Sequence, residues 1–455
     1  MNVEPSMNNN IEAVQPVRAL DTHHPNAYPR TFIAGEGFSS SGHTDSALHR
    51  LMPLEGLRAY LALWVLAGHS LWESGYRPRT LSALPKLILS GEYAVDLFII
   101  SSGFVIFFSL DKQRETYQQF IVRRFFRLFP VFIVLFAFAI PLSQLSMWNV
   151  TLASTYLAPE DVDRLIGTLG SWWENIQWHL PLHLVMLHGL VPEVLLANAP
   201  AAFLIPAWSV SLEWQFYLVA PLAYALAVSS RPFNRLGLCA VCLALFMAAR
   251  YLLPSVTHGA ALPFQVEFFF LGAASYFVYR QLSGRVLPDI LFPVACSLAV
   301  FLFVLSDNSW PLIPIVLWVV FLGLILEHPA SFSSRLVSPL LTNPFVRYLG
   351  RISYSMYLSH ALVIIMMQHA LLMWVPQLIQ MVHAGVLLAC TTVATIAVSA
   401  GLYRFLETPG IQAGRALALR FVGQQAVNTH RELFPSHQTS ERTLARDHQS
   451  WQRQR

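Results

Sequence analysis

The sequence predicts an all-α membrane protein, a polytopic bundle of about ten transmembrane helices. Two observations carry this prediction. Of the 455 residues, 55% are hydrophobic and only 12% are charged, against about 25% charged residues in soluble domains. Apolar runs of about 20 residues, the length of helix that crosses the hydrocarbon layer, recur from position 51 to position 405. Lipid is therefore the predicted solvent for most of the chain.

The predicted spans follow one another in a single membrane domain, residues 51–410. Their ranges are 54–73, 87–109, 128–147, 209–229, 236–254, 261–280, 287–306, 310–327, 352–374 and 380–403. The polar residues 1–50 lack the basic start and apolar stretch of a secretory signal, so they are predicted to form a disordered tail. Residues 411–455, basic at first and polar later, are predicted to form a second tail.

The distribution of basic residues indicates an orientation. Alternate connections such as 110–127 and 328–351 carry several arginines, whereas the long connection 148–208 carries one. Cytoplasmic loops are enriched in Lys and Arg, so the basic side is predicted to be cytoplasmic. Both termini are then cytoplasmic, and the protein is expected in the inner membrane of a cell. Arg77 and Arg79, in the first outer connection, run against this pattern.

Charge and cysteine content argue against two classes of function. The net charge of +4 is small and spread over many loops, so nucleic-acid binding has little electrostatic support. Cys239 and Cys242 form a C-x-x-C pair in an apolar run, with Cys296 and Cys390 on other runs. No second ligand pair lies near any of them, so the four cysteines are predicted to be buried, unreactive thiols, and no metal site is expected.

Ionisable residues inside the apolar spans are the most informative, because such groups are costly in lipid and tend to mark function. Arg58 and His69 are eleven positions apart, which on a helix is three turns plus about 20° and a rise of about 16 Å. Their side chains should share one face, with Arg58 near the cytosol and His69 near the middle of the membrane. A neutral imidazole there could accept a proton from a hydroxyl; a packed histidine bonded to a carbonyl is an equally good interpretation of the spacing.

Other polar groups accompany this pair. Asp96, in the second span, is expected to orient His69 or to pair with an arginine. Arg124 and Arg127 precede the third span, where forked guanidinium groups could bind phosphates, although ordinary positive-inside anchoring also explains them. Glu213 lies about one turn below the outer surface beside hydroxyls and aromatic rings, which predicts a polar pocket open to the outside.

Five blocks of the sequence resemble the membrane-bound acyltransferase-3 family, whose members O-acylate polysaccharides, lipid-linked sugars and some small molecules. In chain order the blocks are Arg58-x10-His69, Val95-Asp96-Leu97-Phe98 with Ser102-Gly103-Phe104, Arg124-x-x-Arg127-x-x-Pro130, Trp208-Ser209-x-Ser211-x-Glu213-x-x-Phe216-Tyr217, and Gly350-x-x-Ser353-Tyr354-Ser355-x-Tyr357-Leu358-x-His360. The resemblance covers about 51–410. Among its departures, Trp214 replaces the usual acidic residue after Glu213, which could alter the acceptor pocket.

The resemblance implies an activity and roles for these residues. Acyl-CoA, with acetyl as the commonest acyl group, would enter from the cytosol, and a carbohydrate, lipid-linked or other hydroxylated acceptor would enter from the other face. Arg58, Arg124 and Arg127 would hold the donor's phosphates. The catalytic set would be His69, as general base or as acylated nucleophile, with Asp96 and with Glu213, which would bind or deprotonate the acceptor. The substrate-binding residues would be Trp208, Ser209, Ser211, Tyr217, Tyr354 and His360.

Two other classes of function fit part of the sequence. A multi-pass transporter of a sugar or lipid would also combine many helices with buried charges, but it would move its substrate without consuming acyl-CoA. A non-catalytic membrane scaffold would leave the polar blocks without a purpose. The order of the five blocks favours the acyltransferase.

Overall fold

The chain is predominantly helical in the part described by the computed structural model, which comprises residues 51–76, 87–113, 115–155, 159–252, 260–283, 312–327, 331–375 and 378–433. Those residues contain no β-strand, which confirms the all-α fold. The predicted span 287–306 and the predicted tail 1–50 lie outside the described residues, as do Arg77, Arg79, Cys296 and the part of the second tail beyond 433. Every other predicted span coincides with a helix.

The helices keep the order of the predicted spans and add several shorter elements. The long elements are α2 (Met52–Glu73), α4 (Gly91–Lys112), α5 (Tyr117–Leu152), α8 (Ala207–Ala227), α9 (Pro232–Met247), α10 (Val266–Leu282), α12 (Ile313–Leu326), α15 (Ser353–Trp374), α16 (Gln380–Leu402) and α17 (Thr408–Leu433). The shorter elements are α6 (Pro159–Glu174), α7 (Ile176–Leu184), η3 (His188–Leu190), η4 (Ala199–Ala201), α13 (Phe332–Thr342) and α14 (Pro344–Arg351).

Several helices have the dimensions of membrane spans. Within the described residues, four helical runs are long and apolar enough to cross a membrane: α4, α5, α15 and the run Gln380–Phe421, which joins α16 to the start of α17. Helices α2 and α8 have 22 and 21 residues, the length of a span, and carry the polar groups Arg58, His69 and Glu213. The chain is therefore a polytopic helix bundle, and the number of ten spans stays a prediction.

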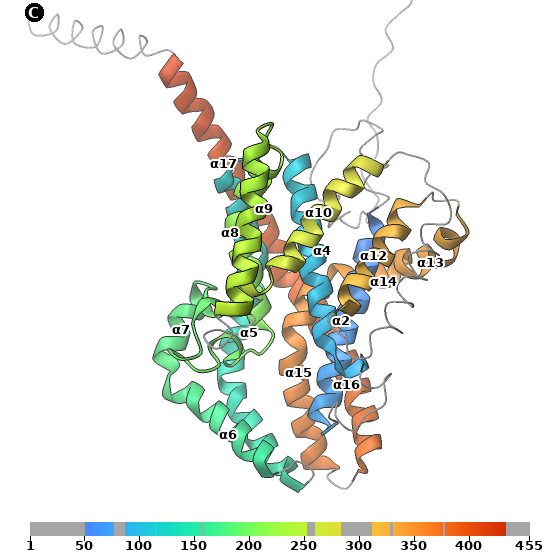
Figure 1. Cartoon of the computed structure of the whole chain (residues 1–455). Coiled ribbons are helices and arrows are strands. Elements are labelled where there is room, and N and C mark those ends of the chain that lie inside the picture. The colour runs from blue at the N-terminus through green and yellow to red at the C-terminus, as the bar shows by residue number, and fades with distance from the viewer. Residues whose placement is uncertain are drawn as a thin grey trace, which may run out of the picture.

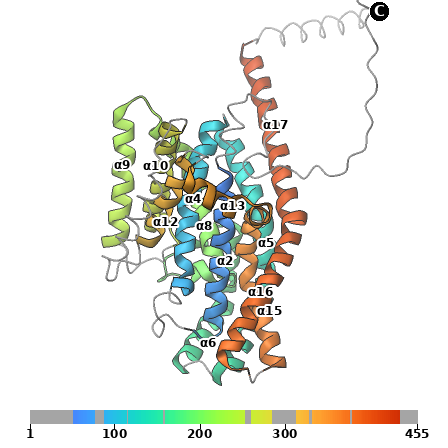
Figure 2. The same cartoon turned by 90° about the vertical axis from the view of Figure 1, so that its right-hand side faces the viewer.

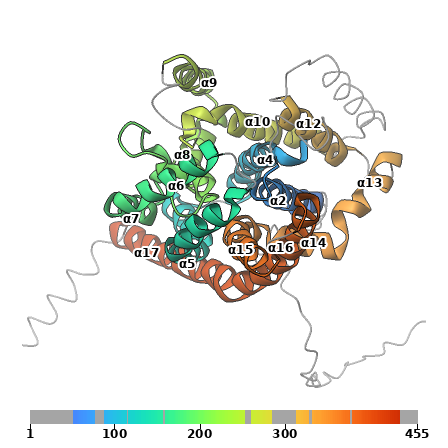
Figure 3. The same ribbon diagram turned by 90° about the horizontal axis from the view of Figure 1, so that it is seen from below.

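Helices α2 and α4 lie in the middle of the bundle when it is viewed end on (Figure 3). Helix α2 packs against α4, α13, α14, α15 and α16, and α4 packs against α8, α10 and α12 on its other side. Helix α5 packs against α15, α8 and α17. Segments from the start, middle and end of the chain therefore surround one interior, where the polar blocks of the sequence can meet.

The two ends of the bundle differ. Helices α6 and α7 lie at one end and the far part of α17 extends beyond the other (Figures 1 and 2). Trp172 of α6 is buried and the indole of Trp173 donates to the hydroxyl of Ser143 on α5 at 3.0 Å, so α6 is fixed to the bundle. Trp148 and Trp178 are exposed, as expected for residues at a membrane interface.

A π-helical turn, η8 (Tyr403–Glu407), connects α16 to α17 without a break in the helical run. Helix α17 continues across position 410, the predicted end of the membrane domain, and packs along α5. Gly410 allows this close approach, because a Cβ atom at that position would lie 2.7 Å from the carbonyl oxygen of Phe126.

The cysteines differ from their prediction. Cys239, Cys242 and Cys390 are free thiols, but Cys239 and Cys390 are exposed on the outside of the bundle. Helix α9, which carries Cys239, has no buried residue at all. The prediction of burial was wrong because an apolar run faces lipid as readily as it faces a protein core.

Candidate functional site

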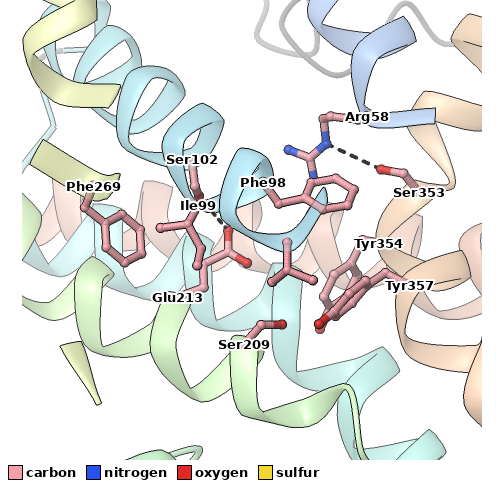
Figure 4. Close-up of a pocket in the computed structure, with 11 residues that line it drawn as sticks. Arg58, Phe98, Ile99, Ser102, Ser209, Glu213, Phe269, Ser353, Tyr354 and Tyr357 are labelled. Carbon is pink, nitrogen blue, oxygen red and sulfur yellow. Dashed lines mark hydrogen bonds between the residues drawn. The ribbon is translucent and has the colours of Figure 1, made fainter. Parts of the chain in front are cut away.

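A cavity of about 50 Å³ lies where α2, α4, α8, α10 and α15 meet (Figure 4). It is lined by Arg58, Val95, Phe98, Ile99, Ser102, Ser209, Glu213, Phe269, Ser353, Tyr354 and Tyr357. Four of the five sequence blocks contribute to this lining, the exception being the block of Arg124 and Arg127. The fold thus brings together residues that lie far apart in the sequence.

Arg58 enters the cavity from α2. Its Nε donates a hydrogen bond to the hydroxyl of Ser353 at 3.4 Å, and its guanidinium lies 5.7 Å from the centre of the Phe98 ring. Two glycines bring the neighbouring helices close to this end of α2. A Cβ atom at Gly56 would lie 2.0 Å from the carbonyl oxygen of Leu341, and one at Gly350 would lie 1.9 Å from that of Glu55. The backbone that carries Arg58 is therefore tightly held.

Glu213 enters the cavity from α8. Its Oε1 accepts hydrogen bonds from the Ser102 hydroxyl, at 3.1 Å, and from the Tyr217 hydroxyl one helical turn further along. Both of these bonds end on Oε1, and no hydrogen bond from another described residue ends on the second carboxylate oxygen. Glu213 thus lies in a cavity with polar groups from α4 as well as α8, and the opening of this pocket to the outside stays a prediction.

Arg124 lies behind the cavity rather than in it. It is 9% exposed, and its Nη2 donates to the Ser109 hydroxyl at 2.9 Å. Its guanidinium lies over the rings of Phe120 and Tyr217, at 5.1 and 5.6 Å from their centres. Its Nε has no hydrogen-bond partner among the described residues. Arg124 therefore reaches Glu213 only through the ring of Tyr217.

Arg127 and the carboxylate of Glu407 form a second charged group. The charge of Arg127 acts on Arg58, on Tyr354 and on Glu407. Glu407 ends the π-helical turn η8, is fully buried, and accepts a hydrogen bond from the Ser355 hydroxyl at 2.7 Å. Arg58 and Arg127 thus lie close enough to Glu407 for their charges to act on it, and the charge of Glu213 acts on Arg58.

His69 does not line the cavity. Its ring lies 5.2 Å from the ring of His360, which in turn lies 5.9 Å from the ring of the cavity residue Tyr357. His360 is buried, and its Nδ1 donates to the Tyr357 carbonyl at 2.6 Å, which leaves Nε2 as an acceptor in the neutral ring. That Nε2 has no partner in the described part of the chain. The two histidines therefore form a pair directly beyond the cavity.

Asp96 is not found with its expected partners. Within the described residues, no hydrogen bond or ion pair joins Asp96 to His69 or to an arginine, and Asp96 is absent from the cavity lining. The charges that act on it are those of Glu92 and Glu267. Spacing along one helix could not show this, because Glu267 comes from α10.

The predicted substrate-binding residues occupy three different positions. Ser209 and Tyr354 line the cavity, and the Tyr354 hydroxyl donates to the Leu128 carbonyl at 2.7 Å. Tyr217 and His360 lie one layer behind. Ser211 is buried elsewhere, where its hydroxyl accepts from the Gly189 amide at 3.0 Å and thereby holds the outer segment. Trp208 packs against the hydrophobic core and is not part of the cavity lining.

Several cavity residues were not selected from the sequence. Ser102, Ser353 and Tyr357 lie inside the sequence blocks, so their positions were visible but their roles were not. Phe269 carries no sequence signal, because it is one of several phenylalanines in an apolar run. The described residues contain no group of three or more His, Cys, Asp or Glu side chains that could hold a metal ion.

Comparisons with known proteins identify a family for the chain. A family model described as an acyltransferase domain matches residues 54–404. Acyltransferase MdmB of Streptomyces mycarofaciens is 32% identical over 216 residues, which cover 46% of this chain and 47% of that protein. The match thus spans about half the length of that relative. No solved structure matches the chain.

Proposed function

The chain belongs to the acyltransferase-3 family, whose domain it matches over residues 54–404, and from this premise we propose that it is an integral membrane O-acyltransferase. It transfers an acyl group, acetyl in the simplest case, from acyl-CoA to a hydroxyl of a carbohydrate, lipid-linked or other hydroxylated acceptor. It resides in the inner membrane with both termini in the cytoplasm.

The observation that supports this proposal best is the composition of the cavity. A guanidinium, a carboxylate and several hydroxyls meet in a small interior space between five helices. In the reaction the acceptor oxygen attacks the thioester carbonyl, a C–O bond forms, the C–S bond breaks, and the hydroxyl proton passes to the CoA sulfur. Negative charge develops on the carbonyl oxygen, where preorganised donors stabilise it. Arg58, Ser209 and Tyr357 supply such donors.

The proton requires an acceptor near the attacking hydroxyl. We assign this role to His69, with Glu213 hydrogen-bonding the acceptor hydroxyl through its second carboxylate oxygen. The unliganded cavity ends at Tyr357, and the His69–His360 pair lies directly beyond it. Catalytic contacts are often long in unliganded enzymes and shorten when substrates bind, so this separation is compatible with the role. His360 positions the His69 ring.

The donor binds from the side of the arginines. Arg124 and Arg127 offer guanidinium forks that suit the phosphates of CoA, whereas Arg58 lines the cavity and serves the thioester carbonyl. Helix α5 begins at Tyr117, so Arg124 and Arg127 both lie within three turns of its predicted cytosolic end. The acceptor then approaches from the opposite end, where α6 and α7 lie.

The experiment uses membranes from cells that lack the gene and are complemented with wild-type protein or His69→Ala. The membranes receive radiolabelled acetyl-CoA, and the label found in alkali-labile esters is measured. We expect wild-type protein to form labelled ester and His69→Ala to lose at least about 100-fold of this activity.

His369→Ala is the matched control. His369 lies on α15, bonds to the Asn149 side chain and is absent from the cavity lining. Its loss should therefore leave ester formation within about twofold of wild type. Protein levels in the membrane are measured for each variant. Normal ester formation by a well-inserted His69→Ala protein would refute the role of His69. Absence of labelled ester in wild-type membranes, together with substrate movement, would favour a transporter.

A further inference from the structure

One part of the cavity lining is apolar. Ile99 of α4 and Phe269 of α10 form it, whereas Arg58 and Ser353 lie at the opposite end of the group of lining residues (Figure 4). Glu213 lies between them, with its Oε1 already engaged by two hydroxyls. The cavity therefore has a polar region suited to a reacting carbonyl and an apolar end suited to a hydrocarbon.

The volume of the cavity restricts what it accepts. A space of about 50 Å³ holds roughly three to five water-sized groups. A sugar ring or the pantetheine arm of CoA is considerably larger. The part of the two substrates that fits is the acyl group itself, if it has only about two or three carbons. This step rests on the proposed function, since it assumes that an acyl group is the transferred group.

Phe269 forms a firm wall at the apolar end. Its side chain is buried, and its ring stacks on that of Phe216 with centroids 4.0 Å apart. Its backbone is held against α4, because a Cβ atom at Gly103 would lie only 2.5 Å from the Phe269 carbonyl oxygen. One turn further on, a Cβ atom at Gly272 would lie 2.0 Å from the carbonyl oxygen of Ile100. Close-packed interiors of this kind yield little to an added methylene group.

From these contacts we propose that Phe269 sets the maximum length of the acyl chain that the protein transfers. The acyl chain lies against Ile99 with its end at the Phe269 ring. Acetyl and propionyl groups fit, and longer chains meet the ring. Replacement of Phe269 by a smaller residue extends the cavity towards Phe216 and admits longer chains.

A competition experiment tests this inference without identification of the acceptor. The complemented membranes receive an equimolar mixture of acetyl-, propionyl-, butyryl- and hexanoyl-CoA, and the esters formed are released by alkali and quantified by mass spectrometry. The butyryl-to-acetyl ratio is compared between wild type and Phe269→Ala. We expect this ratio to rise at least about tenfold in Phe269→Ala, since one methylene in a fitted pocket changes selectivity by about 10-fold or more. Phe269→Leu serves as a milder variant in case the alanine protein does not fold.

Phe268→Ala is the matched control, because Phe268 is adjacent, partly buried against the same core and absent from the cavity lining. The butyryl-to-acetyl ester ratio of Phe268→Ala should stay within twofold of the wild-type ratio. Two outcomes overturn the inference and leave the proposed function intact. In the first, the butyryl-to-acetyl ratio changes less than threefold in both Phe269 variants; in the second, it rises as much in Phe268→Ala as in Phe269→Ala. Failure of wild-type membranes to form any ester overturns the proposed function instead.

Discussion

Glu213 is a carboxylate in the interior of a helix bundle, and two hydroxyl groups stabilise it there. Ser102 and Tyr217 donate to the same oxygen, from α4 and α8 respectively. A buried carboxylate without hydrogen bonds would cost several kcal/mol, on the order of the whole stability of many proteins. The chain carries this costly group together with its two donors, as the proposed role of Glu213 in binding the acceptor requires.

Replacement of Glu213 by Gln should reduce ester formation about 100-fold, because the amide keeps the shape of the side chain but accepts hydrogen bonds less strongly and carries no charge. The measurement is the radiolabelled ester assay on membranes that contain equal amounts of protein. Tyr217→Phe provides the comparison: it removes one of the two bonds to Oε1 and should cost about tenfold at most. Equal activities for Glu213→Gln and wild type would exclude a direct role for this carboxylate.

The residues of the site could be predicted in part. Motif spacing selected Arg58, Glu213, Ser209 and Tyr354, all of which line the cavity. It also placed Arg58 and His69 on one face of α2, but it could not show that His360 lies next to His69. Spacing determines where a side chain lies along its own helix, whereas contacts between helices depend on which helices become neighbours.

Helices α4 and α10 pack closely because each has a glycine, which lacks a side chain, where the two helices meet. Gly103 on α4 and Gly272 on α10 leave room for backbone atoms of the facing helix to approach. In membranes, where lipid is as apolar as a leucine side chain, such close packing between small residues is a main source of helix association. Hydropathy detected both helices as spans but contained no information about this contact.

Gly272→Val should therefore destabilise the protein, by about 1–3 kcal/mol, because its Cβ atom would overlap the carbonyl oxygen of Ile100. The measurement is the loss of folded protein on heating detergent extracts. Gly385→Val on α16 is the control, since a Cβ atom there meets nothing within 4 Å, and its melting temperature should match that of wild type within a few degrees. Equal melting temperatures for both variants would show that the α4–α10 contact tolerates separation.

The segment between α5 and α8 contains a cluster of buried histidines that hydropathy did not detect. Three fully buried histidines lie there: His183 stacks on His188 with ring centroids 4.0 Å apart and on Phe136 at 4.5 Å, and His179 packs edge-on to His183. His188 Nε2 donates to the Ala207 carbonyl at 3.0 Å, which joins this cluster to the start of α8. The helices α6 and α7 are short, and their apolar residues are interleaved with polar ones, so no long apolar run marked them.

Acid should loosen this segment. Burial lowers the pKa of His179 and of His188 to about 4, and it lowers the pKa of His183 well below its usual value. The unfolded histidines, with pKa values of about 6.5, bind protons first as the pH falls, so stability is fully present above about pH 6.5 and is lost between about pH 6.5 and 4. Hydrogen exchange of residues 176–190, corrected for intrinsic rates, should be at least about tenfold faster at pH 5 than at pH 7.5.

The helices α13 and α14 act as an internal reference for that measurement, because residues 332–351 contain no histidine. Their corrected exchange rates should change little over the same range of pH. Equal acceleration in both regions would indicate a general loss of stability rather than protonation of the three histidines.

At the scale of the whole molecule, the bundle has two chemically different ends with the cavity between them. The end with α6 and α7 carries the exposed tryptophans Trp148 and Trp178, and α17 extends from the other end (Figures 1 and 2). This asymmetry suits a reaction whose two substrates come from opposite compartments. Charge counting along the sequence predicted which end faces the cytosol, but a helix bundle by itself does not distinguish inside from outside.

Cysteine labelling in intact cells tests this orientation. In a protein whose native cysteines are replaced by serine, Glu160→Cys on α6 and Arg420→Cys on α17 introduce single thiols at exposed positions. Arg420 lies at the end of the apolar run Gln380–Phe421, towards the far part of α17. A membrane-impermeant maleimide should label Glu160→Cys in intact cells, and it should label Arg420→Cys only after permeabilisation, because the positive-inside bias places α17 in the cytosol. The reverse pattern would place the arginines of α5 on the outside, where no acyl-CoA is available, and would thereby remove the donor side of the proposed reaction.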